Sequence, residues 1–79
     1  MTQKEMQTIG ALARASGVKV TTIRYYETIG VLPVAERSQA GQRLYGREAL
    51  MRLRFIRHGR DLGFELADLR ELLEMQDTP

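Results

Sequence analysis

Breaks at glycine and proline are the sequence feature that most limits how this chain can fold. They fall at residues 16–17, 30–33, 38–41 and 63, and they divide the 79 residues into short segments. A hydrophobic core normally organises chains of about 50 to 200 residues, so the segments belong to one domain. A chain this short leaves little room for an elaborate internal active site.

The apolar spacing between the breaks predicts a mainly α fold with a small β-hairpin. Apolar residues recur at helical spacing in four stretches, and two short strand-like runs flank a polar loop. The predicted helices cover residues 9–15, 20–29, 47–62 and 64–75, and the predicted strands cover 34–37 and 42–45. We expect residues 1–7 to be a flexible arm ahead of a folded domain at 8–75. Two helices followed by a hairpin predict a winged helix-turn-helix.

Helix ends and apolar arcs add detail to this prediction. Thr8 can cap the first helix, and Gly30 is well placed to end the second helix in the left-handed conformation. The third helix carries two apolar arcs, one through Ala49, Leu53 and Ile56 and a second through Met51, Phe55 and Leu62. Two arcs predict that this helix packs on two sides, against the first helices and against whatever follows it.

Composition excludes several classes of protein. The segment has no cysteine, so it holds no disulfide and no thiolate metal site. The longest apolar stretches are only a few residues, which fits neither a transmembrane helix nor a signal peptide. We expect a soluble cytoplasmic protein without membrane contact. His58 is the only histidine, and the acidic residues near the C-terminus have no partnering base, so we predict no enzyme activity and no metal or cofactor in this segment.

The charge is divided unevenly along the chain. Residues 1–60 carry 11 Lys or Arg against 4 Asp or Glu, and residues 61–79 carry 1 against 6. Between Arg37 and Arg60 there are seven arginines and the single acid Glu48. Such a field favours a polyanionic partner, and nucleic acid is the common one. The alternative is an ordinary solvated helix face.

The spacing of Ala13, Gly17 and Ile23 fits a helix-turn-helix. That motif needs a small residue where the helices cross, a glycine in the turn and an apolar residue that pins the second helix. Many helical hairpins match this pattern by chance, so its weight depends on the second helix. The side chains predicted to project from that helix are Thr21, Thr22, Arg24, Tyr25 and part of Tyr26.

These side chains suit DNA. Arginine matches guanine as a planar fork, threonine can donate or make methyl contact, and tyrosine hydroxyls reach phosphates. The alternative is that Tyr26 fills the core and that Arg24 pairs with Glu27 at i, i+3.

The predicted hairpin places Arg37, Gln42 and Arg43 around a small polar tip, which is typical of a wing that lies along a phosphate backbone. The alternative is a stabilising hairpin whose arginines keep an edge strand soluble. We assign Leu44 to the core, while Tyr45 either packs or touches phosphate.

A family resemblance follows from these motifs. They are Ile9-Gly10-x-Leu12-Ala13, Gly17-Val18, Thr22-Ile23-Arg24-Tyr25-Tyr26-Glu27-x-Ile29-Gly30-x-Leu32-Pro33, Arg43-x-Tyr45 and Leu62-Gly63-Phe64. Together they resemble the amino-terminal DNA-binding domain of the MerR family of transcription regulators, over about residues 8–73. The resemblance implies DNA contacts from Arg24, Tyr25, the wing around Arg43 and the third helix near Arg57 and Arg60.

The same resemblance implies a mechanism. A dimer binds a near-palindromic promoter site with an overlong spacer. It activates or represses by distorting the spacer in response to an effector sensed outside this segment, and the distortion lets RNA polymerase engage both promoter elements. Residues 76–79 would lead toward a dimerisation helix. The predicted DNA-binding set is Lys19, Thr21, Thr22, Arg24, Tyr25, Tyr26, Arg37, Gln42, Arg43, Tyr45, Arg57 and Arg60.

Three positions depart from the family pattern. Lys19 and Glu65 stand where hydroxyl caps are usual, and each loss costs about 1 kcal/mol of helix stability. Lys19 can replace the cap with a phosphate contact. Gly59 stands where alanine is common and is expected to cost the third helix up to about 1 kcal/mol.

Two further functions stay open. One is an effector-free, excisionase-like architectural DNA-binding protein with the same fold. The other is a protein-interaction module that uses the apolar side of the fourth helix, and a flat response of binding to salt would favour it.

Overall fold

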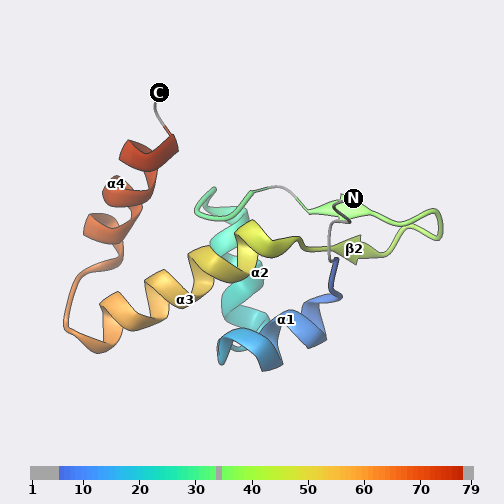
Figure 1. Cartoon of the computed structure of the whole chain (residues 1–79), viewed down its shortest axis with the longest axis horizontal. Helices are drawn as coiled ribbons and strands as arrows, with labels where there is room; N and C mark the ends of the chain where they lie inside the picture. The colour runs from blue at the N-terminus through green and yellow to red at the C-terminus, as the bar shows by residue number, and fades with distance from the viewer. Residues whose placement is uncertain (1–5, 34, 78–79) are drawn as a thin grey trace, which may run out of the picture.

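A computed structural model describes residues 6–33 and 35–77 of the chain. In these residues the order of elements is α1 (Ile9–Ser16), α2 (Val20–Thr28), β1 (Glu36–Arg37), β2 (Arg43–Leu44), α3 (Arg47–Asp61) and α4 (Leu66–Asp77). The long helix α3 runs through the middle, with the hairpin at one end and α4 at the other (Figure 1). The predicted mainly α fold with a small hairpin is confirmed.

Helices α1 and α2 form the predicted helix-turn-helix. The Thr8 hydroxyl accepts a hydrogen bond from the Ala11 amide at 3.3 Å, which confirms the predicted cap. Gly17 takes φ +75° in the turn, a conformation that favours glycine. Lys19 gives α2 no side-chain cap. Gly30, at φ +81°, turns the chain after α2, as predicted.

The hairpin is shorter than predicted. Strands β1 and β2 pair antiparallel over two residues each, with Arg37 opposite Arg43. Gln42 lies outside the strand and closes the loop. Its amide donates to the Ser38 hydroxyl at 3.1 Å, and its carbonyl accepts a hydrogen bond from the Ser38 amide at 2.8 Å. Val34 lies outside the described residues. Gln7 pairs with Tyr45 through two backbone hydrogen bonds of 2.8 Å, so the ordered fold begins within the predicted arm.

The core consists of two clusters along one arc of α3. The first cluster joins α1, α2, the hairpin and the first half of α3, and its buried members are Leu12, Ile23, Leu32, Tyr45, Ala49 and Leu53. The second joins the segment after α2, the last turns of α3 and α4, and its buried members are Val31, Ile56, Leu69 and Leu73. Helix α3 therefore packs against different elements along its length.

Helix α3 packs against the first helices and against α4, as predicted, but it does so through one arc and not through two. Met51 and Leu62 are 53% and 65% exposed, and of the second arc only Phe55 packs partly against the second cluster. The helix rises about 1.5 Å per residue, so a single arc reaches the helix-turn-helix with one half and α4 with the other.

The crossing of α3 and α4 depends on Gly59. A Cβ atom at this position would lie 2.4 Å from Cδ2 of Leu69, which is buried. Gly59 therefore allows a close approach between the two helices. This contact gives a structural reason for a glycine at a position where its helix propensity alone is unfavourable. Helix α4 begins at Leu66, two residues later than predicted, and Phe64 is 49% exposed.

Within the described residues, no helix is long and apolar enough to cross a membrane.

Candidate nucleic-acid interface

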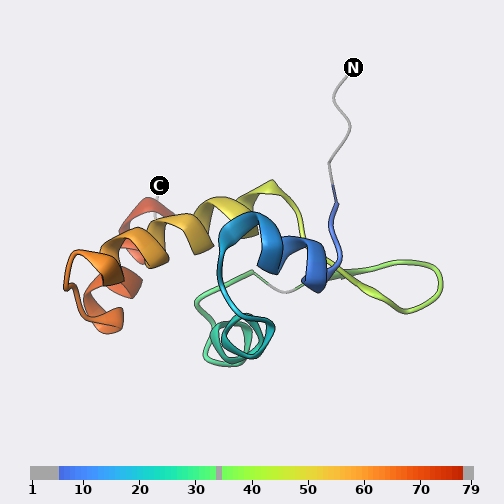
Figure 2. The same cartoon turned by 90° about the horizontal axis from the view of Figure 1, so that it is seen from below.

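Helix α2 stands out from one face of the molecule. Figure 2 shows it end-on, below α1 and α3, with the hairpin on one side and the α3–α4 end on the other. Ile23 is fully buried and anchors the helix, while Thr21, Arg24 and Tyr25 are exposed. The structure thus presents the predicted reading face to solvent. Tyr26 is half-buried and packs against both core clusters. The alternative prediction that Tyr26 fills the core is therefore correct in part.

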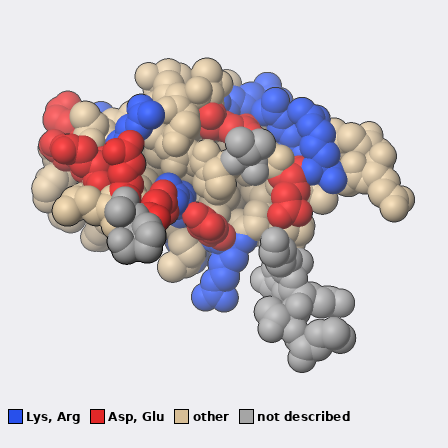
Figure 3. Space-filling model, turned by 90° about the horizontal axis from the view of Figure 1, so that it is seen from above, with Lys and Arg blue, Asp and Glu red and all other residues tan. Residues whose placement is uncertain are grey.

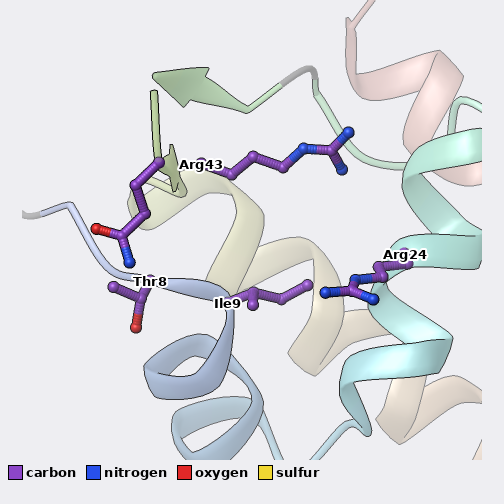
Figure 4. A pocket seen from close by; sticks show the side chains of 5 residues that line it. Thr8, Ile9, Arg24 and Arg43 are labelled. Atoms are coloured by element: carbon purple, nitrogen blue, oxygen red, sulfur yellow. The ribbon is translucent and has the colours of Figure 1, made fainter. Parts of the chain in front are cut away.

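A cleft of about 500 Å³ separates α2 from the hairpin, and we call it the wing cleft. Its lining residues are Thr8, Ile9, Arg24, Gln42 and Arg43. Figure 4 shows the Arg24 side chain reaching from α2 toward Ile9, with Arg43 above it on the hairpin. The cleft brings together three predicted DNA-binding residues from two separate elements.

A second cleft of about 360 Å³ lies at the other side of α2, and we call it the turn cleft. It is lined by Gly17, Val18, Lys19, Thr22, Tyr26, Arg57, Arg60 and Asp61. Five of these residues belong to the predicted DNA-binding set, and they come from the α1–α2 turn, from α2 and from the end of α3. The two clefts thus flank the reading face of α2.

The arginines of the turn cleft also hold the fold. Arg57 donates to the Ser16 carbonyl at 3.3 Å, and Arg60 donates to the Phe64 carbonyl at 3.0 Å. A Cβ atom on Gly17 would lie less than 2.5 Å from the Arg57 guanidinium, so the turn glycine makes room for this contact. Each guanidinium has five N–H donors, so both arginines keep donors for an anion.

Glu27 is a site residue that the sequence did not reveal. Its Oε1 accepts hydrogen bonds from Arg43 at 2.9 Å and from the Tyr45 hydroxyl at 3.0 Å, and its Oε2 accepts one from the Ala35 amide at 3.2 Å. The carboxylate faces the hairpin, so the predicted alternative of an Arg24–Glu27 pair is wrong. Only the Tyr-Tyr-Glu motif pointed to this position.

Tyr45 corrects one member of the predicted set. It is 1% exposed and its hydroxyl is engaged by Glu27, so it packs in the core instead of touching phosphate. Burial, and then the adjacent Glu27 carboxylate, raise the pKa of Tyr45 above its usual value of 10.0. Leu44, assigned to the core, is only half-buried. Arg37 is exposed and donates to the Gly41 carbonyl at 2.8 Å, which places it at the wing tip.

Arg52 is set apart from the other arginines of the basic segment. It pairs with Glu48 one turn earlier and with Asp77 at the end of α4, and it donates to the Val31 carbonyl at 3.2 Å. The hydrogen bond with Asp77 raises the pKa of Arg52. The Glu48–Arg52 spacing of four residues was the available signal for this pairing.

The charge on the surface follows the sequence pattern. Figure 3 shows basic side chains in a band beside the hairpin and many acidic side chains at the opposite end, with further acidic side chains in the middle and next to the basic band. Among the described residues no group of three or more His, Cys, Asp or Glu side chains is placed to hold a metal ion.

Comparisons with known proteins agree on one family. The family model described as "MerR HTH family regulatory protein" matches residues 7–76. The transcriptional regulator ZntR of Escherichia coli K12 is 46% identical over 74 residues, which are 94% of this chain and 52% of that protein. The mercuric resistance operon regulatory protein of Bacillus cereus is 44% identical over 69 residues, covering 87% of this chain and 52% of that protein. This chain thus spans about half the length of these relatives.

Solved structures give the same result. The regulator PbrR691 of Ralstonia metallidurans CH34, in complex with lead(II), matches with a TM-score of 0.82 and 40% identity over 92% of this chain and 57% of that one. HiNmlR, a MerR family regulator lacking the sensor domain and bound to promoter DNA, matches with a TM-score of 0.81 and 25% identity over 91% of this chain and 55% of that one.

Proposed function

This chain belongs to the MerR family of helix-turn-helix regulatory proteins, and on that premise we propose that it binds promoter DNA sequence-specifically as the DNA-binding domain of a transcription regulator. The observation that carries the proposal is the exposed face of α2 between two basic clefts. A recognition helix in the major groove needs flanking groups that hold the phosphate backbone on both sides. The wing cleft and the turn cleft supply such groups.

The geometry supports a separate role for each group. Arg24 and Thr21, which are exposed on α2, read base edges. Phosphates are held at the wing by Arg37, Gln42 and Arg43, on α2 by Thr22, Tyr25 and Tyr26, and at the turn cleft by Lys19, Arg57 and Arg60. Tyr45 is removed from this set because it is buried.

The action of the whole protein is part of the proposal. A homodimer binds a near-palindromic site in an overlong promoter spacer, and an effector sensed outside this segment leads it to bend and untwist the spacer for RNA polymerase. Distortion of this kind makes affinity depend on base pairs that the protein never touches. The similarity to a mercuric resistance operon regulatory protein and to a transcription regulator solved in complex with lead(II) supports this proposal without identifying the effector.

Fluorescence anisotropy of the 79-residue chain tests the proposal. The probes are the inverted-repeat duplex upstream of its own gene and a scrambled duplex, each over a series of NaCl concentrations. About six phosphate contacts predict a slope near −5 in log K against log salt. Arg24→Ala should lower affinity for the specific duplex about 5- to 150-fold, which corresponds to about 1 to 3 kcal/mol for one bidentate base contact.

Arg70→Ala is the matched control, since Arg70 is exposed on α4 and lines neither cleft. It removes the same charge and should leave the preference for the specific duplex unchanged. Binding that ignores salt, or equal losses in the two variants, would overturn the proposal.

An effector-free architectural protein is a second candidate. The observation in its favour is HiNmlR, which resembles this chain and lacks a sensor domain. The length of the native gene separates the two candidates, because a long helix and a sensor segment after residue 79 favour the effector-dependent regulator.

A further inference from the structure

One carboxylate joins the reading helix to both limbs of the wing. Glu27 lies in the last turns of α2, and its side chain is only 13% exposed. Its three hydrogen-bond donors are the Ala35 amide, just before β1, the Arg43 guanidinium on β2 and the Tyr45 hydroxyl just after β2. Both oxygens are used, so the carboxylate fixes the hairpin at several points.

The hairpin is held at its base, where Gln7 pairs with Tyr45 through two backbone hydrogen bonds, but its strands are short. Its strands pair over two residues each, and a two-stranded hairpin of that size is marginal alone. Tyr45 anchors its base in the core, while Glu27 is a polar link from α2 to the hairpin. The angle between the reading helix and the wing therefore depends on Glu27 as well as on the contacts of Tyr45.

Glu27 also governs an arginine of the wing cleft. The Arg43 side chain is 47% exposed, so one edge of its guanidinium meets Glu27 while the rest faces solvent. A negative charge close to the interface opposes the general attraction of DNA phosphates. Its charge alone therefore does not favour DNA binding, and a favourable effect has to come from the geometry that it enforces.

From these observations we propose that Glu27 is a positioning residue that sets sequence discrimination: its carboxylate holds the wing and Arg43 in register with the reading face of α2. This inference rests on the proposed DNA-binding function. Glu27 acts through Arg43 and the hairpin, and it need not touch DNA.

The test compares Glu27→Gln with Glu71→Gln in anisotropy titrations of the 79-residue chain on specific and scrambled duplexes. Both variants remove one negative charge, and Glu71 is exposed on α4, away from both clefts. Glu27→Gln should lower the ratio of specific to scrambled affinity about tenfold, while affinity for the scrambled duplex holds or rises because a repelling charge is gone. Glu71→Gln should keep the wild-type ratio.

A purely structural role predicts a different pattern, in which both affinities fall together as the folded fraction falls. Arg43→Gln, made in both backgrounds, adds a second readout. It should lower specific affinity in the wild-type chain and have little further effect in the Glu27→Gln chain, because the two residues act as one unit. Additive losses, or an unchanged ratio in Glu27→Gln, would overturn the inference.

Two controls keep the outcomes distinct. If Glu27→Gln loses its cooperative thermal transition, Tyr45→Phe replaces it, since this variant removes only the hydroxyl that meets Glu27. Tyr45→Phe should lower the ratio in the same direction by about threefold, and an unchanged ratio counts against the inference. If the wild-type chain itself does not distinguish the duplexes, the proposed function fails first.

Discussion

The two ends of α3 are held by different kinds of contact. At the wing end, a cluster that includes the buried Tyr45 is tied to a polar network through Glu27 and Arg43. At the α4 end, aliphatic side chains meet at close range over Gly59, and Arg52 adds ion pairs with Glu48 and Asp77 at the edge of the cluster. Polar contacts orient the hairpin at the wing end, whereas at the α4 end the absence of a side chain on Gly59 lets the two helices pack closely.

This difference has a functional meaning. Hydrogen bonds fix orientation more strictly than apolar contacts do, and DNA reading requires orientation. The α4 end leaves large apolar side chains exposed, including Leu62, Leu72 and Met75. Stability and reading geometry should therefore respond to different substitutions.

The largest expected effect separates the two core clusters. Leu53 is fully buried in the first cluster, whereas Leu73 is 4% exposed in the second, close to the end of α4. Leu53→Ala should lower the free energy of unfolding by about 3 to 5 kcal/mol and Leu73→Ala by about 2 to 3 kcal/mol. Urea denaturation followed by circular dichroism gives both values. Equal losses would mean that the clusters contribute alike.

Two helical glycines sharpen the comparison. Gly59→Ala places a Cβ against buried Leu69 and should destabilise by about 1 to 2 kcal/mol, after allowance for the better helix propensity of alanine. Gly10→Ala is the matched control in α1, because its Cβ would meet nothing closer than Arg14 at 3.7 Å. It should stabilise by about 0.5 to 1 kcal/mol. The same urea titrations measure both, and a stabilising Gly59→Ala would contradict the close approach.

Lys19→Ser tests stability against function at the turn cleft. The hydroxyl supplies the missing cap of α2 and should add up to about 1 kcal/mol of stability. The lost cation should weaken DNA binding for all sequences and reduce the salt slope by about 1. Thermal melts and anisotropy measure the two effects, and a variant that loses both stability and affinity would exclude the capping argument.

The smallest expected effect is a dependence on alkaline pH at the wing end. The pKa of Tyr45 is raised in the folded chain, so folding holds its proton more tightly. Its contribution is complete below the unfolded pKa of about 10 and is lost as pH rises through the folded pKa. Urea titrations at pH 9 and 11 should show a smaller loss of stability in Tyr45→Phe than in the wild-type chain. Identical losses would remove this role for Tyr45.

The features that the sequence predicted correctly are those that depend on residues close together along the chain. Thr8 and Gly30 sit at helix ends, where local rules decide, and the spacing of Ala13, Gly17 and Ile23 matched the turn that forms. These signals placed α2 and its exposed side chains correctly.

Long-range contacts account for what the sequence missed. Glu27 meets Arg43 across 16 positions, and Gly59 meets Leu69 across a helix crossing, so neither contact leaves a periodic signal. The incorrect assignment of Leu44 to the core has another cause. Side chains alternate faces along a strand, so in a strand of two residues an error of one position reverses inside and outside.

The most direct test of the central claim is an NMR titration of the ¹⁵N-labelled chain with a duplex of about 20 base pairs. We expect amide shift changes in residues 19–26 of the turn and α2, in residues 37–43 of the hairpin and in residues 57–60 of α3. Residues 66–77 of α4 should change little. Shift changes confined to α4, with α2 and the hairpin unaffected, would contradict the assignment of the DNA-binding face.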